Sequence, residues 1–154
     1  MTKKFRFLIL CLAACLFLTA CTTSFSYTFQ IETGEHIKVT LDTTGGQKLT
    51  QDNGTFTVNS SGGDALTLGV FLLEEQTESY FDNLPSSDEV TILEQNSLSG
   101  MSYIFYTYSD AEASYWNYVI KPDSAVTGIG LTNEISQKSA EEVFALLDFE
   151  KVAE

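Results

Sequence analysis

Hydrophobic and polar residues alternate along much of the chain, which is the pattern of half-buried β-strands. Alternation starts at Phe25 and is regular from Ile37 to Leu41. The segments QKLTQ (47–51) and TFTVNS (55–60) flank Asn53-Gly54, a strong hairpin signal because both residues tolerate positive φ. Further strands are predicted over 65–73, 90–94, 101–108, 115–121 and 125–132.

Two segments follow the helical period instead. Apolar spacing predicts a short helix over 77–83, which ends before Pro85 because a proline disfavours helical geometry in the residue that precedes it. Near the C-terminus, Ser139 and Glu142 have the spacing of a capping box and predict a second helix. One face of that helix is expected to carry Ala140, Val143, Phe144 and Leu147.

These elements predict the α+β class: an antiparallel β-sheet meander of about five to eight strands, with one short middle helix and a C-terminal helix packed on the sheet. The segment MSYIFYTYS (101–109) is apolar on both faces and is expected to be a central strand. Gly128 and Gly130 are expected to leave room for the C-terminal helix or for a neighbouring aromatic residue. The element order over residues 35–150 resembles the PsbP-like α/β/α fold, which implies a non-catalytic binding or assembly role.

The N-terminal segment differs in composition from the rest of the chain. Three basic residues precede an apolar run over 7–18, which is too short for a membrane span of roughly 20 residues and fits a secretory signal. The run leads into Leu18-Thr19-Ala20-Cys21, which resembles the lipobox of bacterial lipoproteins. An ordinary signal peptide with an incidental cysteine is the alternative.

The lipobox resemblance implies a division of the chain into three parts. Residues 1–20 are the signal peptide that is removed, and residues 21–26 are the lipidated cysteine and a short tether. Residues 27–154 form a single α+β domain. Cys21 carries the fatty acyl chains, such as palmitate, that anchor the protein to the membrane. Since the other two cysteines lie in the removed segment, no disulfide is expected.

Charge excludes several classes of function. From residue 21 onward the chain has five lysines, no arginine and 21 acidic residues, a formal charge of −16. Such a surface repels a phosphate backbone, so nucleic acid is excluded as a partner. The absence of arginine and of a glycine-rich phosphate loop disfavours a nucleotide or phosphosugar site.

Motifs for catalysis are sparse in this part of the chain. His36 is its only imidazole, and no nucleophile-elbow sequence accompanies it, so neither a serine triad nor a zinc site is expected. We therefore predict no metal, no cofactor and no enzymatic activity. Two acidic clusters are interpreted as solvated surface, and weak calcium binding to them stays open; they comprise Glu74, Glu75 and Glu78, and Asp110 and Glu112.

Aromatic residues concentrate on two adjacent predicted strands. Most of them are expected to fill the core. Four are candidate contacts to a ligand or partner, because exposed Trp and Tyr rings stack on sugars or on apolar side chains. These four are Tyr106, Tyr108, Trp116 and Tyr118.

The predicted function is a bacterial cell-envelope lipoprotein whose soluble domain is a non-catalytic binding or scaffolding module. It is expected on the extracytoplasmic face of the cell membrane, anchored through its N-terminal lipid, with an extracytoplasmic protein or glycan as partner. In a Gram-negative source, Thr22 after the cysteine implies the outer membrane. The alternative is a carbohydrate-recognition or carboxylate-dependent glycan-processing domain.

Overall fold

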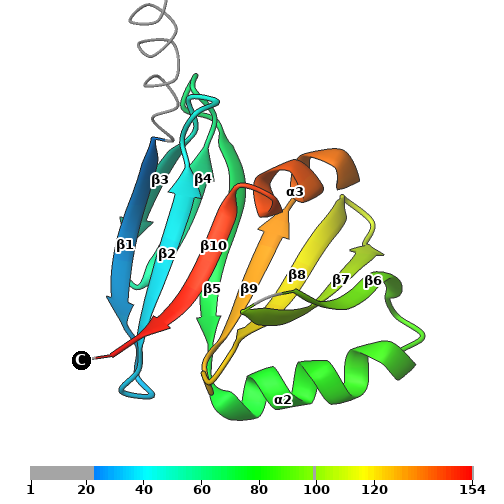
Figure 1. The fold of residues 1–154 in the computed structure, drawn as a ribbon. Coiled ribbons are helices and arrows are strands. Elements are labelled where there is room, and N and C mark those ends of the chain that lie inside the picture. Colours follow the sequence, from blue (N-terminus) through cyan, green and yellow to red (C-terminus); the bar gives the residue numbers. More distant parts are fainter. Residues whose placement is uncertain (1–22, 99, 154) are drawn as a thin grey trace, which may run out of the picture.

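The computed structural model describes residues 23–98 and 100–153, and within them the chain forms two antiparallel sheets and two α-helices (Figure 1). The α+β class is therefore confirmed. The segment with the lipobox pattern, Leu18 to Cys21, lies outside the described residues. Of the helices that are described, none is long and apolar enough to cross a membrane.

The smaller sheet has three strands in the order β1-β2-β10. Its strands are β1 (Ser24–Gln30), β2 (His36–Asp42) and β10 (Leu147–Val152). Strand β1 begins inside the expected tether, since its alternating aromatic residues pair with β2 from Ser24 onward. The strand β10 was missed by the sequence prediction.

The larger sheet has seven strands in the order β3-β4-β5-β9-β8-β7-β6, so the described strands exceed the predicted number. They are β3 (Lys48–Asp52), β4 (Thr55–Asn59), β5 (Ala65–Leu72), β6 (Thr91–Leu98), β7 (Met101–Ser109), β8 (Ser114–Pro122) and β9 (Gly128–Asn133). The predicted β3–β4 hairpin is confirmed, with φ of 46° at Asn53 and 79° at Gly54. Strand β7 is second from the edge, not central as expected.

Strand β7 is apolar on both faces because a different layer covers each face. Phe105 belongs to the core between the two sheets, whereas Ile104 belongs to a second cluster that includes Leu84, from the 3-10 turn η2 (Leu84–Ser86) after helix α2. Phe105 and Ile104 are almost fully buried, with exposed fractions of 1% and 0% respectively. Burial on both faces therefore did not require a central position.

The C-terminal helix α3 spans Gln137–Phe144 and begins earlier than predicted. Its N-cap is Ser136, whose hydroxyl oxygen accepts the backbone N–H of Ser139 at 3.1 Å. Ser139 is inside the helix, so the predicted capping box is wrong. Leu147 is also not helical, because it starts β10, which pairs with β2. An unpaired edge of β2 at this place favours a strand over a further helical turn.

Four phenylalanines join the two sheets. Phe29 of β1 and Phe149 of β10 contact the Phe56 ring of β4, with ring centroids 5.9 and 6.3 Å apart. Phe71 of β5 packs against Phe29 and Phe56. A Cβ atom at Gly69, which pairs with Phe56 across β4 and β5, would overlap the Phe56 ring. The glycine therefore makes the space that the central ring occupies.

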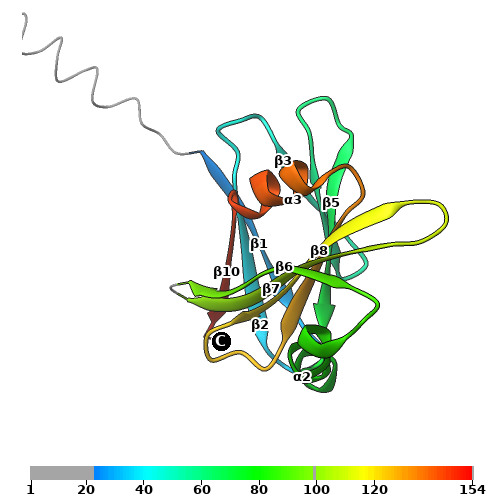
Figure 2. The same cartoon turned by 90° about the vertical axis from the view of Figure 1, so that its right-hand side faces the viewer.

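The middle helix α2 (Glu74–Asn83) begins three residues before the predicted start and covers part of the outer face of the large sheet. Its buried Thr77 packs against Gly128 of β9, where an added Cβ would lie 2.8 Å from Thr77 Cγ2. Gly128 thus makes room for Thr77 of α2, and not for the C-terminal helix or a neighbouring aromatic residue, the two expected neighbours. Figure 2 shows α2 and α3 at opposite ends of the molecule.

We expect Gly128→Ala to lower the free energy of unfolding by about 1–3 kcal/mol, because the new methyl group overlaps Thr77 and displaces α2. Urea unfolding measures the change. Gly62→Ala is the matched control, since its Cβ would lie 3.6 Å from Ser60 Oγ, an ordinary contact distance. Equal stability of the two variants would contradict this account of α2 packing.

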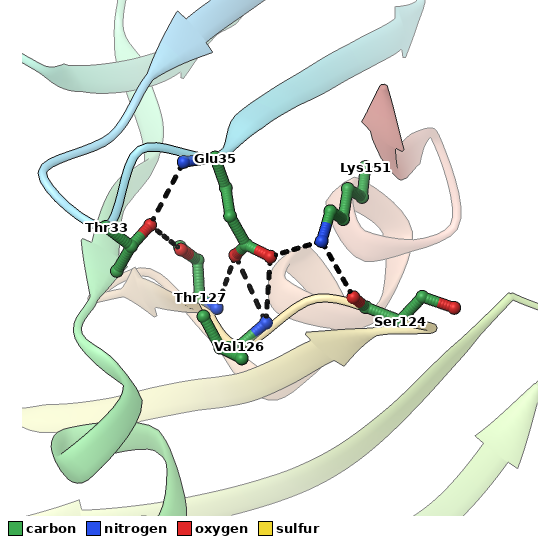
Figure 3. Close-up of polar contacts among 6 residues, drawn as sticks. All are labelled: Thr33, Glu35, Ser124, Val126, Thr127 and Lys151. Atoms are coloured by element: carbon green, nitrogen blue, oxygen red, sulfur yellow. Dashed lines mark hydrogen bonds and ion pairs between the residues drawn. The ribbon is translucent and has the colours of Figure 1, made fainter. Parts of the chain in front are cut away.

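A buried carboxylate links the two sheets at one end of the molecule (Figure 3). Glu35, in the turn before β2, accepts backbone N–H groups from Val126 and Thr127 in the β8–β9 connection. It also forms an ion pair with Lys151 of β10, with Oε1 and Nζ 2.7 Å apart. Lys151 in turn donates to the carbonyl oxygen of Ser124. The carboxylate is therefore saturated and holds three segments together.

The environment of Glu35 favours its charged form. Burial by itself raises its pKa, but the hydrogen bonds from Lys151, Thr127 and Val126 outweigh burial and lower the pKa from 4.5 to about 2. A carboxyl whose pKa is lower in the folded state stabilises the fold at pH above its unfolded value. This contribution is lost as the pH falls from about 4.5 to about 2.

We expect Glu35→Gln to lower the free energy of unfolding at neutral pH by about 3 kcal/mol, the value of the pKa shift at 1.36 kcal/mol per pKa unit. Urea unfolding across the acidic range should show the difference from wild type shrinking below pH 4.5. Glu150→Gln is the control, since Glu150 is 60% exposed and its nearest lysine nitrogen is 3.7 Å away. A Glu35 effect that does not change with pH would contradict the electrostatic explanation.

Candidate binding pocket beside helix α2

The structure separates the four aromatic candidates onto two faces of the large sheet. The β7–β8 register pairs Thr107 with Trp116 and Phe105 with Tyr118, which places Trp116 and Tyr118 on the face toward the core. Tyr106 and Tyr108 alternate with those β7 residues and lie on the opposite, outer face. The four side chains therefore do not form one stacking surface.

The two residues on the core face have structural roles. Tyr118 is 3% exposed, and its ring stacks between Phe105 and Phe144 at centroid distances of 4.2 and 4.1 Å. Burial raises the pKa of its hydroxyl. Trp116 is half-buried against the same core. The Tyr118 ring is therefore enclosed by core residues, whereas Trp116 keeps part of its surface exposed.

The outer face carries a group of tyrosines that we call the tyrosine face: Tyr80, Tyr106, Tyr108 and Tyr115. Tyr108 is 38% exposed and stacks on Tyr115 of β8, with ring centroids 4.8 Å apart and an interplanar angle of 19°. Tyr106 is buried, and this burial, with smaller effects from Tyr80 and Tyr108, raises its pKa to about 12. Sequence reasoning missed Tyr80, because only the packing of α2 brings it to this face.

A pocket of about 90 Å³ lies next to the tyrosine face. Its lining combines apolar side chains with an amide and hydroxyl groups and comes from α2 and from four strands of the large sheet. The lining residues are Val70, Leu72, Tyr80, Tyr106, Asn117, Tyr118, Val119, Gly130, Leu131 and Thr132. Gly130 contributes no side chain, so a Cβ there would lie 3.2 Å from Val70 Cγ2.

The polar group of interest in this pocket is the Asn117 amide. Asn117 is 5% exposed, and its Oδ1 accepts the Thr132 hydroxyl at 2.9 Å. Its Nδ2 has no hydrogen-bond partner among the residues that the structure describes. Rotation of the amide by 180° would leave Oδ1 without a partner instead. A buried polar atom without a partner costs about 1–3 kcal/mol, so its presence needs an explanation.

Asn133, on the neighbouring strand β9, is a second buried asparagine, and both ends of its amide have hydrogen-bond partners within the fold. It is 2% exposed, and its Nδ2 donates to the Leu66 carbonyl and to the Ser139 hydroxyl. Its Oδ1 accepts the backbone N–H groups of Ile135 and Ser136. Asn133 therefore joins β5, β9 and the start of α3, whereas Asn117 Nδ2 has no partner among the described residues.

The histidine and the acidic residues that the sequence analysis considered do not line this pocket. His36 begins β2, and its Nδ1 is buried with no partner among the described residues. Asp110 accepts the backbone N–H groups of Glu112 and Ala113, which lowers its pKa and shapes the β7–β8 turn. Glu74 and Glu75 occupy the first turn of α2, where acidic side chains favour the helix dipole. Within residues 23–98 and 100–153, no three His, Cys, Asp or Glu side chains group as metal ligands.

Comparison with known proteins gives no assignment. No family model matches the chain, and no curated protein matches it. Function must therefore be inferred from the pocket, the tyrosine face and the N-terminal sequence.

Replacing each of the two buried asparagines by valine is expected to change the free energy of unfolding in opposite directions. We expect Asn117→Val to raise the free energy of unfolding by about 1 kcal/mol. Removal of the unpartnered amide nitrogen, which costs about 1–3 kcal/mol, outweighs the loss of the hydrogen bond from the Thr132 hydroxyl to Oδ1, which contributes about 0.5–1.5 kcal/mol. Asn133→Val should lower it by about 2 kcal/mol or more, because several buried groups lose their partner. Chemical denaturation measures both, and a loss of stability in Asn117→Val would contradict the distinction.

Proposed function

We propose that the protein is a lipid-anchored, non-catalytic binding module of the bacterial cell envelope, and that the tyrosine face and its pocket are the ligand site. The observation that carries the proposal is the unpartnered Asn117 amide in a pocket beside exposed Tyr108. Binding sites typically combine apolar and aromatic walls with a few polar groups that orient the ligand. The pocket has this composition.

The position of the pocket supports an outward-facing site. Strand β1 begins at Ser24, only three residues after Cys21, so a lipid at Cys21 would hold the domain close to the membrane. Helix α2 lies at the end of the molecule opposite the start of β1 (Figure 1). Tyr80 of α2 lines the pocket, so this wall lies away from the start of β1 and supports contact with extracytoplasmic partners.

Two further features support binding over catalysis. None of the residues that line the pocket is a carboxylate, which disfavours the glycan-processing form of the alternative function. The order α2, four strands and α3 also agrees with the proposed PsbP-like resemblance, which implies a binding or assembly role. The carbohydrate-recognition form of the alternative is compatible with the tyrosine face.

Photo-crosslinking in membranes tests the proposal. With p-benzoylphenylalanine at position 108, we expect a covalent adduct in the membrane fraction of cells. The same residue at position 25 is the control, because Phe25 is similarly exposed, at 46%, but lies on β1 of the small sheet. Equal adducts at both positions would rule out the tyrosine face as the ligand site.

The anchor is tested on the same protein. Mass spectrometry of the wild-type chain should find fatty acyl chains at Cys21 as its N-terminal residue, and Cys21→Ala should leave the membrane fraction without them. An unmodified Cys21, or a chain that retains residues 1–20, would overturn the anchored part of the proposal.

A further inference from the structure

Resting on the proposed binding function, we propose that the pocket receives the acetamido group of an N-acetylated sugar and that Tyr108 supports the sugar ring. The ligand class is therefore a neutral glycan that contains N-acetylhexosamine units. The juxtaposition of the Asn117 amide, an apolar wall and an exposed tyrosine ring carries this inference.

The size of the pocket selects a small group. Its volume of about 90 Å³ corresponds to roughly three molecules of liquid water. A substituent such as an acetamido group, with one methyl and one carbonyl, matches this space, whereas a whole sugar ring is too large for it. The ring must therefore remain outside, over the tyrosine face.

The lining selects a neutral group that is polar at one end and apolar at the other. No Lys, Asp or Glu lines the pocket, so a charged group would be buried there without a partner, at high cost. Asn117 lines the pocket, and its buried Nδ2, which has no partner among the described residues, is the donor that we assign to a carbonyl oxygen of the ligand. Val70, Leu72 and Val119 provide contacts for a methyl group. A hydroxyl group would satisfy the amide but would leave the apolar wall without a contact.

Tyr108 is the platform for the ring outside the pocket. It lies two residues along β7 from Tyr106, which lines the pocket, and on the same face of the sheet. Stacking on Tyr115 holds its ring in place and so lowers the entropy that binding would cost. The apolar C–H face of a sugar can pack on such a ring while its hydroxyl groups stay in water.

The test compares two trisaccharides by isothermal titration calorimetry with the full-length protein in detergent. Tri-N-acetylchitotriose carries an acetamido group on each ring where cellotriose carries a hydroxyl group. We expect tri-N-acetylchitotriose to bind at least tenfold more tightly. Asn117→Val and Gly130→Ala should each reduce its affinity at least tenfold, since one removes the amide and the other narrows the pocket.

Substitutions of exposed aromatic residues measure the contribution of the Tyr108 ring to affinity apart from that of the pocket. Tyr108→Ala should reduce the affinity for tri-N-acetylchitotriose at least fivefold, whereas Tyr108→Phe, which keeps the ring, should not. Phe25→Ala, at an exposed aromatic on the small sheet, should bind as wild type does. Unchanged affinity in Tyr108→Ala would overturn the role of the ring.

The failure of this inference differs from failure of the binding function. Equal affinity for the two trisaccharides, or unchanged affinity in a folded Asn117→Val variant, would overturn the acetamido assignment. If neither sugar binds while crosslinking at position 108 still exceeds that at position 25, the assignment of a glycan ligand is overturned. The proposed binding function then stands. Loss of that crosslinking difference would remove the binding site itself.

Discussion

The packing of the two sheets depends on the Phe56 ring, which occupies space that a side chain at residue 69 would fill. Phe29 and Phe149 bring the small sheet onto this ring from two different strands. Aromatic pairs of this kind bury large areas and fix the angle at which layers meet. The described residues contain no cysteine and therefore form no disulfide. The small sheet is joined to the large sheet by this aromatic core and by the hydrogen bonds and ion pair of Glu35.

A second close approach, of Thr77 to Gly128, determines the outer face of the large sheet. It places α2 over one end of that face and brings Tyr80 to Tyr106 at the edge of the pocket. The rest of the face is left with exposed Tyr108. One glycine in β9 thus admits the helix, and a second glycine two residues later, Gly130, keeps the pocket open.

Hydrogen-bond partners separate Glu35 and Asn133 from Asn117, and the pocket separates Asn117 from His36, whose Nδ1 also has no partner among the described residues. Glu35 and Asn133 are buried polar side chains whose acceptors or donors are used by the fold itself. Asn117 is equally buried, yet one end of its amide has no partner among the described residues. A fold tolerates such a loss of stability where another molecule restores the hydrogen bond, and this is the physical basis of the proposed ligand site.

The sequence by itself determined the local elements, because period-two alternation and the Asn53-Gly54 turn act within a few residues. It did not reveal β10, whose strand conformation depends on pairing with β2, a strand more than 100 residues earlier. Nor could it tell that Tyr106 lies on the outer face of the large sheet and Trp116 on the core face, since alternation orders side chains but does not say which layer covers each side. The tertiary structure decided these points, because the covering layers and the partners of Asn117, Asn133 and Glu35 come from distant segments of the chain.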